Sequence, residues 1–173
     1  MYYEQVFKVF QTQNVAYLVA GGMAVNLHGV PRFTKDLDIL VDTSQSNLKR
    51  LGAALKQLGY RPRVPVTMDE FLNPANWPKW KKEKGMIAFT LYRSAVPYEE
   101  IDILINSPIP YSVAGKNRVK LKAGAISVQL VSIDDLIRMK RKAGRNQDLS
   151  DIEALKKVKV IKENAAGKSK KRV

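Results

Sequence analysis

The stretch RFTKDLDILVD, residues 32–42, places two acidic side chains against an apolar run. The apolar residues of 37–41 predict a buried β-strand. Asp36 and Asp38 stand two positions apart, so we expect both to point to the same face of that strand. Buried carboxylates are costly unless a positive partner neutralises them. The stretch therefore predicts a sheet with one acidic face that requires a cation.

A second segment, EIDILI at residues 100–105, repeats the pattern of DLDILV at residues 36–41. If the two strands lie close together, Asp102 joins Asp36 and Asp38. Three neighbouring carboxylates repel one another and take up protons unless a cation lies between them. All-oxygen ligands suit Mg²⁺ or Mn²⁺, and two such ions about 3.5–4 Å apart can activate a hydroxyl and stabilise leaving pyrophosphate. We therefore predict these three acids to be metal ligands.

A glycine pair lies upstream of the acids, in VAGGMAV at residues 19–25. Gly21 and Gly22 fall between a predicted strand and a predicted short helix, where paired glycines let backbone N–H groups approach a phosphate. We expect Arg32 and Thr34 to add phosphate or hydroxyl contacts. Together with the acids, the pair predicts a site for a nucleoside triphosphate and its metal ions.

Composition narrows the class of protein further. The chain has 173 residues, 45% of them hydrophobic, which suits one domain with a proper core. Its net charge of +14 predicts a polyanionic partner, with a solubilising surface as the alternative. The absence of cysteine excludes disulfides, thiolate metal sites and a cysteine nucleophile. With no signal peptide or bilayer-spanning segment visible, we expect a soluble, cytoplasmic protein without a membrane partner.

The order of predicted elements indicates an α/β (α+β) fold. We expect a small mixed β-sheet with the acids on one face and helices on the other, followed by C-terminal helices. The expected core spans residues 1–131, and two helices over 132–160 pack on it. Residues 161–173 have the composition of a disordered basic tail.

The segment GGMAVNLHGVPRFTKDLDILVD resembles the signature of the DNA polymerase β-like nucleotidyltransferase superfamily. The resemblance implies that Gly21 and Gly22 form the glycine turn and that Asp36 and Asp38 are the metal-binding pair. It also implies that Asp102 is the third carboxylate, which ligates a metal and helps to activate the acceptor hydroxyl. Many members carry serine where this chain has Gly22.

The C-terminal segment DLIRMKRKAGRNQDLSDIEAL resembles the lysine helix and the R-x-x-D-x-x-D segment of AbiEii-type enzymes, the toxins of type IV toxin–antitoxin systems. The resemblance implies that Lys140 contacts the nucleotide phosphates, with a solvated helix face as the alternative. It implies that Arg145, Asp148 and Asp151 fix the helix pair. For Arg145 and Asp148 we favour a structural role, in which they pair with each other at a helix start.

These resemblances imply a metal-dependent nucleotidyltransferase that moves a nucleoside monophosphate from an NTP to an acceptor hydroxyl and releases pyrophosphate. The expected acceptor is RNA, such as a tRNA end, and an antitoxin protein is a further expected partner. Two alternatives stay open: a small-molecule acceptor, as in antibiotic-modifying members, and a non-catalytic nucleic-acid-binding protein.

Two other features allow a functional and a structural interpretation. Trp77 and Trp80, with the lysines around them, form either a stacking platform for single-stranded nucleic acid or a packed aromatic loop with a basic rim. His28, the only histidine, is interpreted as a packed or surface residue rather than a catalytic base.

Overall fold

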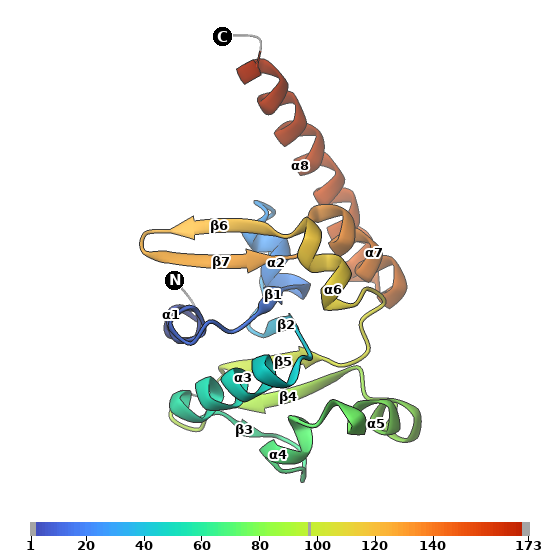
Figure 1. The fold of residues 1–173 in the computed structure, drawn as a ribbon. Coiled ribbons are helices and arrows are strands. Elements are labelled where there is room, and N and C mark those ends of the chain that lie inside the picture. The colour runs from blue at the N-terminus through green and yellow to red at the C-terminus, as the bar shows by residue number, and fades with distance from the viewer. Residues whose placement is uncertain (1–2, 97, 171–173) are drawn as a thin grey trace.

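The computed structural model describes residues 3–96 and 98–170, and these form one mixed sheet with helices around it (Figure 1). The strand order is β3-β4-β5-β2-β1-β7-β6. The β2–β5 and β1–β7 pairs are parallel and the other neighbours are antiparallel. The strands are β1 Tyr17–Val19, β2 Leu37–Val41, β3 Arg61–Pro62, β4 Ala88–Tyr92, β5 Glu100–Leu104, β6 Val119–Ala123 and β7 Ile126–Leu130. The expected mixed sheet is therefore confirmed.

Helices connect these strands and extend the chain beyond them. The α-helices are α1 Glu4–Thr12, α2 Gly21–Leu27, α3 Gln45–Leu58, α4 Met68–Phe71, α5 Trp77–Lys84, α6 Tyr111–Ala114, α7 Ile133–Ala143 and α8 Asn146–Lys170. Two 3₁₀ turns, η1 Pro74–Asn76 and η2 Gly115–Asn117, follow α4 and α6. In the part of the chain that the structure covers, no helix has both the length and the apolar character needed to cross a bilayer.

The two faces of the sheet differ in polarity. On one face, Ile39 of β2 lies beside Ile103 of β5, which lies beside Phe89 of β4, and all three are fully buried. Phe89 stacks on Phe71 of α4 and on Trp80 of α5, at centroid distances of 4.0 and 5.8 Å. Helices α4 and α5 therefore cover this apolar face.

At the other end of the same face, Tyr17 of β1 packs against two phenylalanines of α1, Phe7 and Phe10. Helix α3 lies beside α1, and its buried Asn47 donates to the carbonyls of Ala16 and Asp42. These bonds tie the start of α3 to the strand ends. The opposite face of β2 and β5 carries the acids.

Polar side chains and glycines define several helix ends. The Ser132 hydroxyl accepts from the Asp135 N–H at 3.1 Å and so caps the start of α7. Ser44 precedes α3, but its hydroxyl donates to Asp42 at 3.1 Å and does not cap the helix. Gly144 closes α7 with a φ of 68°, which suits glycine.

Helix α8 is longer than the sequence suggested. Residues 161–173 were expected to be a disordered tail, but the helix continues to Lys170; residues 171–173 lie outside the described part. The start of α8 is held by buried Asp151, Ile152 and Leu155. Once a helix is nucleated, each added residue gains a hydrogen bond at little cost, and the Lys, Glu and Ala residues that follow favour helix. The expected boundary between residues 131 and 132 stays a prediction.

Candidate active site

The acidic residues of β2 and β5 lie side by side. Asp38 pairs in register with Asp102 across the parallel strands, and Asp102 pairs with Thr90 of β4. Adjacent strands are about 4.8 Å apart and directly opposed residues share a face. Asp36 directly precedes β2. The structure thus brings Asp38 and Asp102 together as the repeated sequence pattern predicts.

The electrostatics of these acids indicate uncompensated negative charge. Burial, followed by repulsion from Asp102 and Asp36, raises the pKa of Asp38 from 3.8 to about 6. The charge of Lys140 and a hydrogen bond from the Gly22 N–H act in the opposite direction. One buried oxygen of Asp36 and one of Asp102, Oδ1 in each case, have no hydrogen-bond partner. Buried carboxylate oxygens without partners are costly, which makes them candidates for ligand contact.

These acids can be tested for fit to a divalent cation. Within residues 3–96 and 98–170, no three His, Cys, Asp or Glu side chains lie close enough together to hold an ion as they are placed. The carboxylate of Asp38 instead turns to the glycine turn. The donor set is nonetheless all oxygen, and two buried oxygens lack partners. The residues therefore fit a hard cation such as Mg²⁺, and the assignment of Asp36, Asp38 and Asp102 as ligands stays a prediction.

Close approach explains why two glycines start α2. Gly21 has a φ of 57°, and a Cβ there would overlap the Asp38 carboxylate. A Cβ on Gly22 would lie 2.7 Å from Thr34 Oγ1 and 2.9 Å from Arg32 Nη1. A serine cannot fit at position 22 unless these neighbours move. The Thr34 hydroxyl therefore occupies the space that a side chain at position 22 would need.

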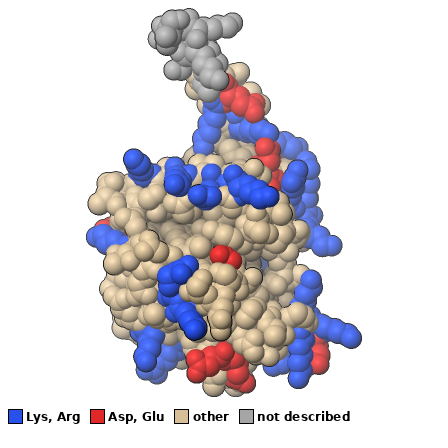
Figure 2. All heavy atoms as spheres, viewed as in Figure 1, with Lys and Arg blue, Asp and Glu red and all other residues tan. Residues whose placement is uncertain are grey.

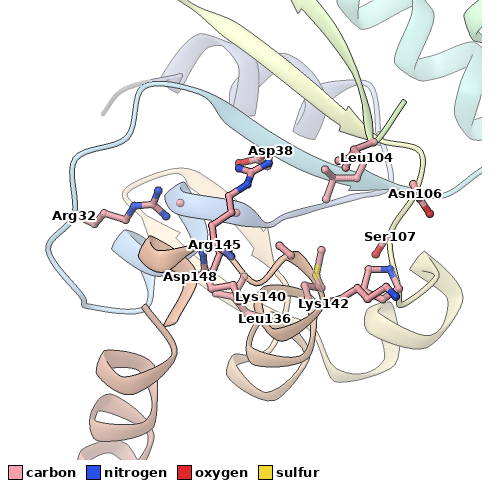
Figure 3. Close-up of a pocket in the computed structure, with 16 residues that line it drawn as sticks. Arg32, Asp38, Leu104, Asn106, Ser107, Leu136, Lys140, Lys142, Arg145 and Asp148 are labelled. Atoms are coloured by element: carbon pink, nitrogen blue, oxygen red, sulfur yellow. Dashed lines mark hydrogen bonds and ion pairs between the residues drawn. The ribbon is translucent and has the colours of Figure 1, made fainter. Parts of the chain in front are cut away.

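A pocket of about 490 Å³ opens beside this turn (Figure 3). Its lining includes Gly21, Gly22 and Asp38 on the sheet side and Met139 of α7. Arg32, Lys140 and Arg145 also line the pocket, whereas Asp36 and Asp102 lie outside its lining. A cavity of this size, with cations in its lining, can hold a phosphorylated small molecule.

Lys140 is not the solvated residue that one interpretation of its basic surroundings suggested. Its side chain is buried, and Nζ lies 2.6 Å from Asp151 Oδ2 and 3.0 Å from Asp148 Oδ1. Arg32 Nη1 lies 2.7 Å from the same Asp151 oxygen. The two cations thus share the Asp151 carboxylate, and Lys140 also binds Asp148, so the four side chains connect the loop before β2 to α7 and α8. We call these four residues the ion network.

Arg145 and Asp148 pair with each other at the start of α8, as expected, and the contact is made by the backbone of Arg145. Asp148 Oδ2 accepts the Arg145 backbone N–H at 3.2 Å. Lys140 holds the other oxygen of Asp148. The Arg145 side chain is exposed and extends into the pocket (Figure 3). The sequence analysis gave Arg145 a structural role only, because spacing alone does not show which of two nearby cations the acids hold.

The remaining candidates are structural. Trp77 and Trp80 are buried, and Trp77 Nε1 donates to the Phe71 carbonyl at 2.8 Å. The stacking-platform interpretation is therefore wrong, since the rings already pack on Phe71 and Phe89. His28 is buried, 2.8 Å from the Val131 carbonyl, so its packed role is confirmed.

The match to a family profile shows that the chain is a nucleotidyltransferase, and the solved structures that it resembles share its fold. More particularly, the chain belongs to the family described as "Nucleotidyl transferase AbiEii toxin, Type IV TA system", whose profile matches residues 8–169. A comparison with curated protein sequences finds no match.

Three solved structures are similar to this chain at low identity. Lincosamide antibiotic adenylyltransferase LnuA, with lincomycin bound, is 16% identical with a TM-score of 0.58, over 88% of this chain and 93% of that one. ANT(2")-Ia with adenylyl-2"-tobramycin is 14% identical with a TM-score of 0.54, over 96% and 94%. An antigenic nucleotidyltransferase-like protein from Paracoccidioides brasiliensis is 18% identical with a TM-score of 0.54, over 87% and 71%. Identities this low show the shared fold alone.

Proposed function

We propose that this enzyme transfers a nucleoside monophosphate from an NTP to a hydroxyl of RNA. The observation that carries the proposal is the in-register pair Asp38 and Asp102 beside the glycine turn, with a pocket in front of it. In this reaction the acceptor oxygen bonds to the α-phosphorus, the bond to the β-phosphate bridge breaks, and pyrophosphate leaves.

The three acids and several residues of the pocket lining have roles in this proposal. Asp36 and Asp38 would hold Mg²⁺, which when bound offsets charge on the phosphates and on the leaving pyrophosphate. Backbone N–H groups of the glycine turn and the Arg145 guanidinium bind the phosphates. Asp102 orients the acceptor hydroxyl and draws its proton. Lys140 positions these groups from within the ion network, although a direct phosphate contact was predicted for it.

The charge of the surface supports RNA as the acceptor. Figure 2 shows a row of Lys and Arg over β6, where Lys120 and Lys122 are exposed. Lys120 pairs with Gln129 of β7, and the strand registers put Gln129 on the sheet face that carries Asp38. Lysines two apart share a face, so both point to the same side as the acids. Such a row suits a phosphate backbone. The family suggests a toxin role with an antitoxin partner.

The proposal is tested by offering the protein each α-labelled NTP with Mg²⁺ and total RNA. We expect label in RNA from the wild type, loss of that label with a chelator, and loss with Asp38→Asn. The Lys49→Gln variant is a matched control, since this exposed lysine of α3 lies outside the pocket lining. Absence of label from every RNA pool, while the folded protein binds NTP, would contradict the RNA acceptor.

A small-molecule acceptor is the second candidate. This chain spans 93–94% of the two antibiotic-modifying enzymes to which it is similar, so it has the length of enzymes with small acceptors. The net charge of +14 argues against cationic acceptors such as aminoglycosides. Adding lincosamides and aminoglycosides to the same labelling assay separates the two candidates.

A further inference from the structure

The loop over residues 31–36, between α2 and β2, exposes its residues alternately. Arg32, Thr34 and Asp36 are half-buried, whereas Phe33 and Lys35 are exposed. Such alternation is what a segment with side chains on opposite sides produces. Arg32 and Thr34 face the glycine turn, and Arg32 also joins the ion network. Phe33 and Lys35 therefore form the outer side of a loop whose inner side belongs to the active site.

Contacts on both sides of Phe33 hold this loop in place. Arg32 is bound to Asp151 of α8 at 2.7 Å. The Tyr3 hydroxyl lies 2.6 Å from the Lys35 carbonyl and 2.7 Å from the Glu100 carbonyl of β5. Because Arg32 and Lys35 are both held by these contacts, the position of the loop relative to the sheet is fixed. The exposure of Phe33 is thus part of an ordered structure.

Phe33 is 90% exposed, the highest exposure among the large hydrophobic side chains that the structure describes as exposed. A single exposed apolar residue is ordinary on a protein surface. The position of this one is what distinguishes it. Three peptide units separate it from Asp36, so their Cα atoms lie within about 11 Å of each other. An aromatic ring and a lysine therefore lie on the exposed side of the loop that carries Asp36.

We propose that Phe33 and Lys35 form a platform for the single-stranded RNA end that receives the nucleotide. A base of the acceptor stacks on the Phe33 ring, and Lys35 contacts a neighbouring phosphate. Stacking on an exposed aromatic ring accepts any base, so the platform positions the strand without reading its sequence. This inference rests on the proposed RNA acceptor, and it names the surface that holds that acceptor.

The test uses the full chain and two substitutions of one residue. Phe33→Trp keeps a ring and introduces an exposed indole, whose emission differs from that of buried Trp77 and Trp80. Phe33→Leu keeps an apolar side chain and removes the ring. Both are titrated with single-stranded RNA of mixed sequence, about ten nucleotides long. Inorganic polyphosphate is the control ligand, because it carries the charge without bases.

We expect RNA to quench the indole of Phe33→Trp with saturation, and polyphosphate to leave it unchanged. Phe33→Leu should bind RNA about 5- to 100-fold more weakly than wild type, with unchanged binding of NTP and Mg²⁺ and an unchanged melting temperature. An unquenched indole, equal quenching by polyphosphate, or wild-type RNA affinity in Phe33→Leu would each overturn the platform. These readouts measure binding alone, so they remain valid if the labelling assay finds no transfer to RNA.

Discussion

The two regions beside the pocket differ in whether their buried charges have partners within the protein. On the α7–α8 side, Lys140 and Arg32 are matched by Asp148 and Asp151 at 2.6–3.0 Å. On the sheet side, Asp36 and Asp102 each have one oxygen without a hydrogen-bond partner, and burial, followed by repulsion from these two acids, raises the pKa of Asp38. Charge that is compensated within the protein stabilises the fold, whereas uncompensated charge marks the place where a ligand completes the structure.

The largest effect is expected from removing the buried cation of the ion network. Lys140→Met leaves Asp148 without its lysine partner, and Asp151 keeps Arg32 and the Gln147 amide but loses the lysine. We expect the free energy of unfolding to fall by about 3–5 kcal/mol, measured by denaturant titration. Lys142→Met is the control, since this exposed lysine should change stability by less than about 0.5 kcal/mol. Equal stabilities of the two variants would show that the network does not stabilise the fold.

Arg145 is a cation that lines the pocket but is exposed, unlike the buried Lys140. It therefore tests whether an unburied cation binds the ligand without stabilising the fold. Arg145→Met should weaken binding of NTP with Mg²⁺ by about 1.5–3 kcal/mol, the range for a hydrogen bond to a charged group. Its free energy of unfolding should stay close to that of wild type. Calorimetric titration measures the affinity, and Arg145→Lys should recover part of it. If Arg145→Met binds NTP normally, the phosphate contact belongs to another cation.

The glycine turn can be tested by filling its free space. Gly22→Ser places a Cβ against Thr34 Oγ1 and Arg32 Nη1, and such overpacking costs about 1–3 kcal/mol. We expect lower stability and weaker NTP binding. The double variant Gly22→Ser with Thr34→Gly should recover both, because it removes the obstructing side chain and restores one hydroxyl. A double variant no better than the single one would show that Thr34 is not the limiting neighbour.

The smallest effect is expected from Asp38→Asn, which should raise the free energy of unfolding instead of lowering it. In a chelator at neutral pH, Asp38→Asn should raise the free energy of unfolding by about 1–2 kcal/mol, since repulsion and burial of charge are relieved. The folded protein binds the Asp38 proton more tightly than the unfolded chain does, with a pKa of about 6 against 3.8. Wild-type stability should therefore fall as the pH rises through this interval, and this part of the fall should be absent from Asp38→Asn.

In the presence of Mg²⁺ and NTP, we expect the wild type to be more stable than Asp38→Asn. The ligands stabilise whichever protein binds them, and we expect that to be the wild type alone. Thermal unfolding with and without Mg²⁺ and NTP provides the measurement. If the wild type is the more stable protein in chelator as well, the acids are compensated in a way that the structure does not show.

Local patterns in the sequence were sufficient for much of the site. The period of two in an apolar strand placed Asp36 and Asp38, and the repeated pattern placed Asp102 on a neighbouring strand, as the register of Asp38 with Asp102 confirms. The glycine pair predicted a tight turn, since glycine alone permits both the φ of Gly21 and the nearby Asp38 carboxylate. In each case the signal lies within a few residues of the feature that it predicts.

The predictions that failed concern contacts between residues that only the tertiary structure brings together. Lys140 and Arg145 lie five positions apart, and only the packing of α7 on α8 determines that the acids hold the lysine. Trp77 and Trp80 could have stacked on a base, but Phe71 and Phe89 occupy their faces. Composition does not reveal these contacts, because aromatic residues and lysines can either pack within a protein or bind a ligand.

Helix α8 also affects how the molecule moves in solution. With 25 residues it is about 37 Å long, and beyond its packed first turns it projects from the body of the protein (Figure 1). A compact chain of 173 residues has a radius of gyration of about 16 Å. The projecting helix moves mass away from the centre, so small-angle scattering should give a larger radius. It should also increase the friction that the monomer experiences, and size-exclusion chromatography would then overestimate its mass.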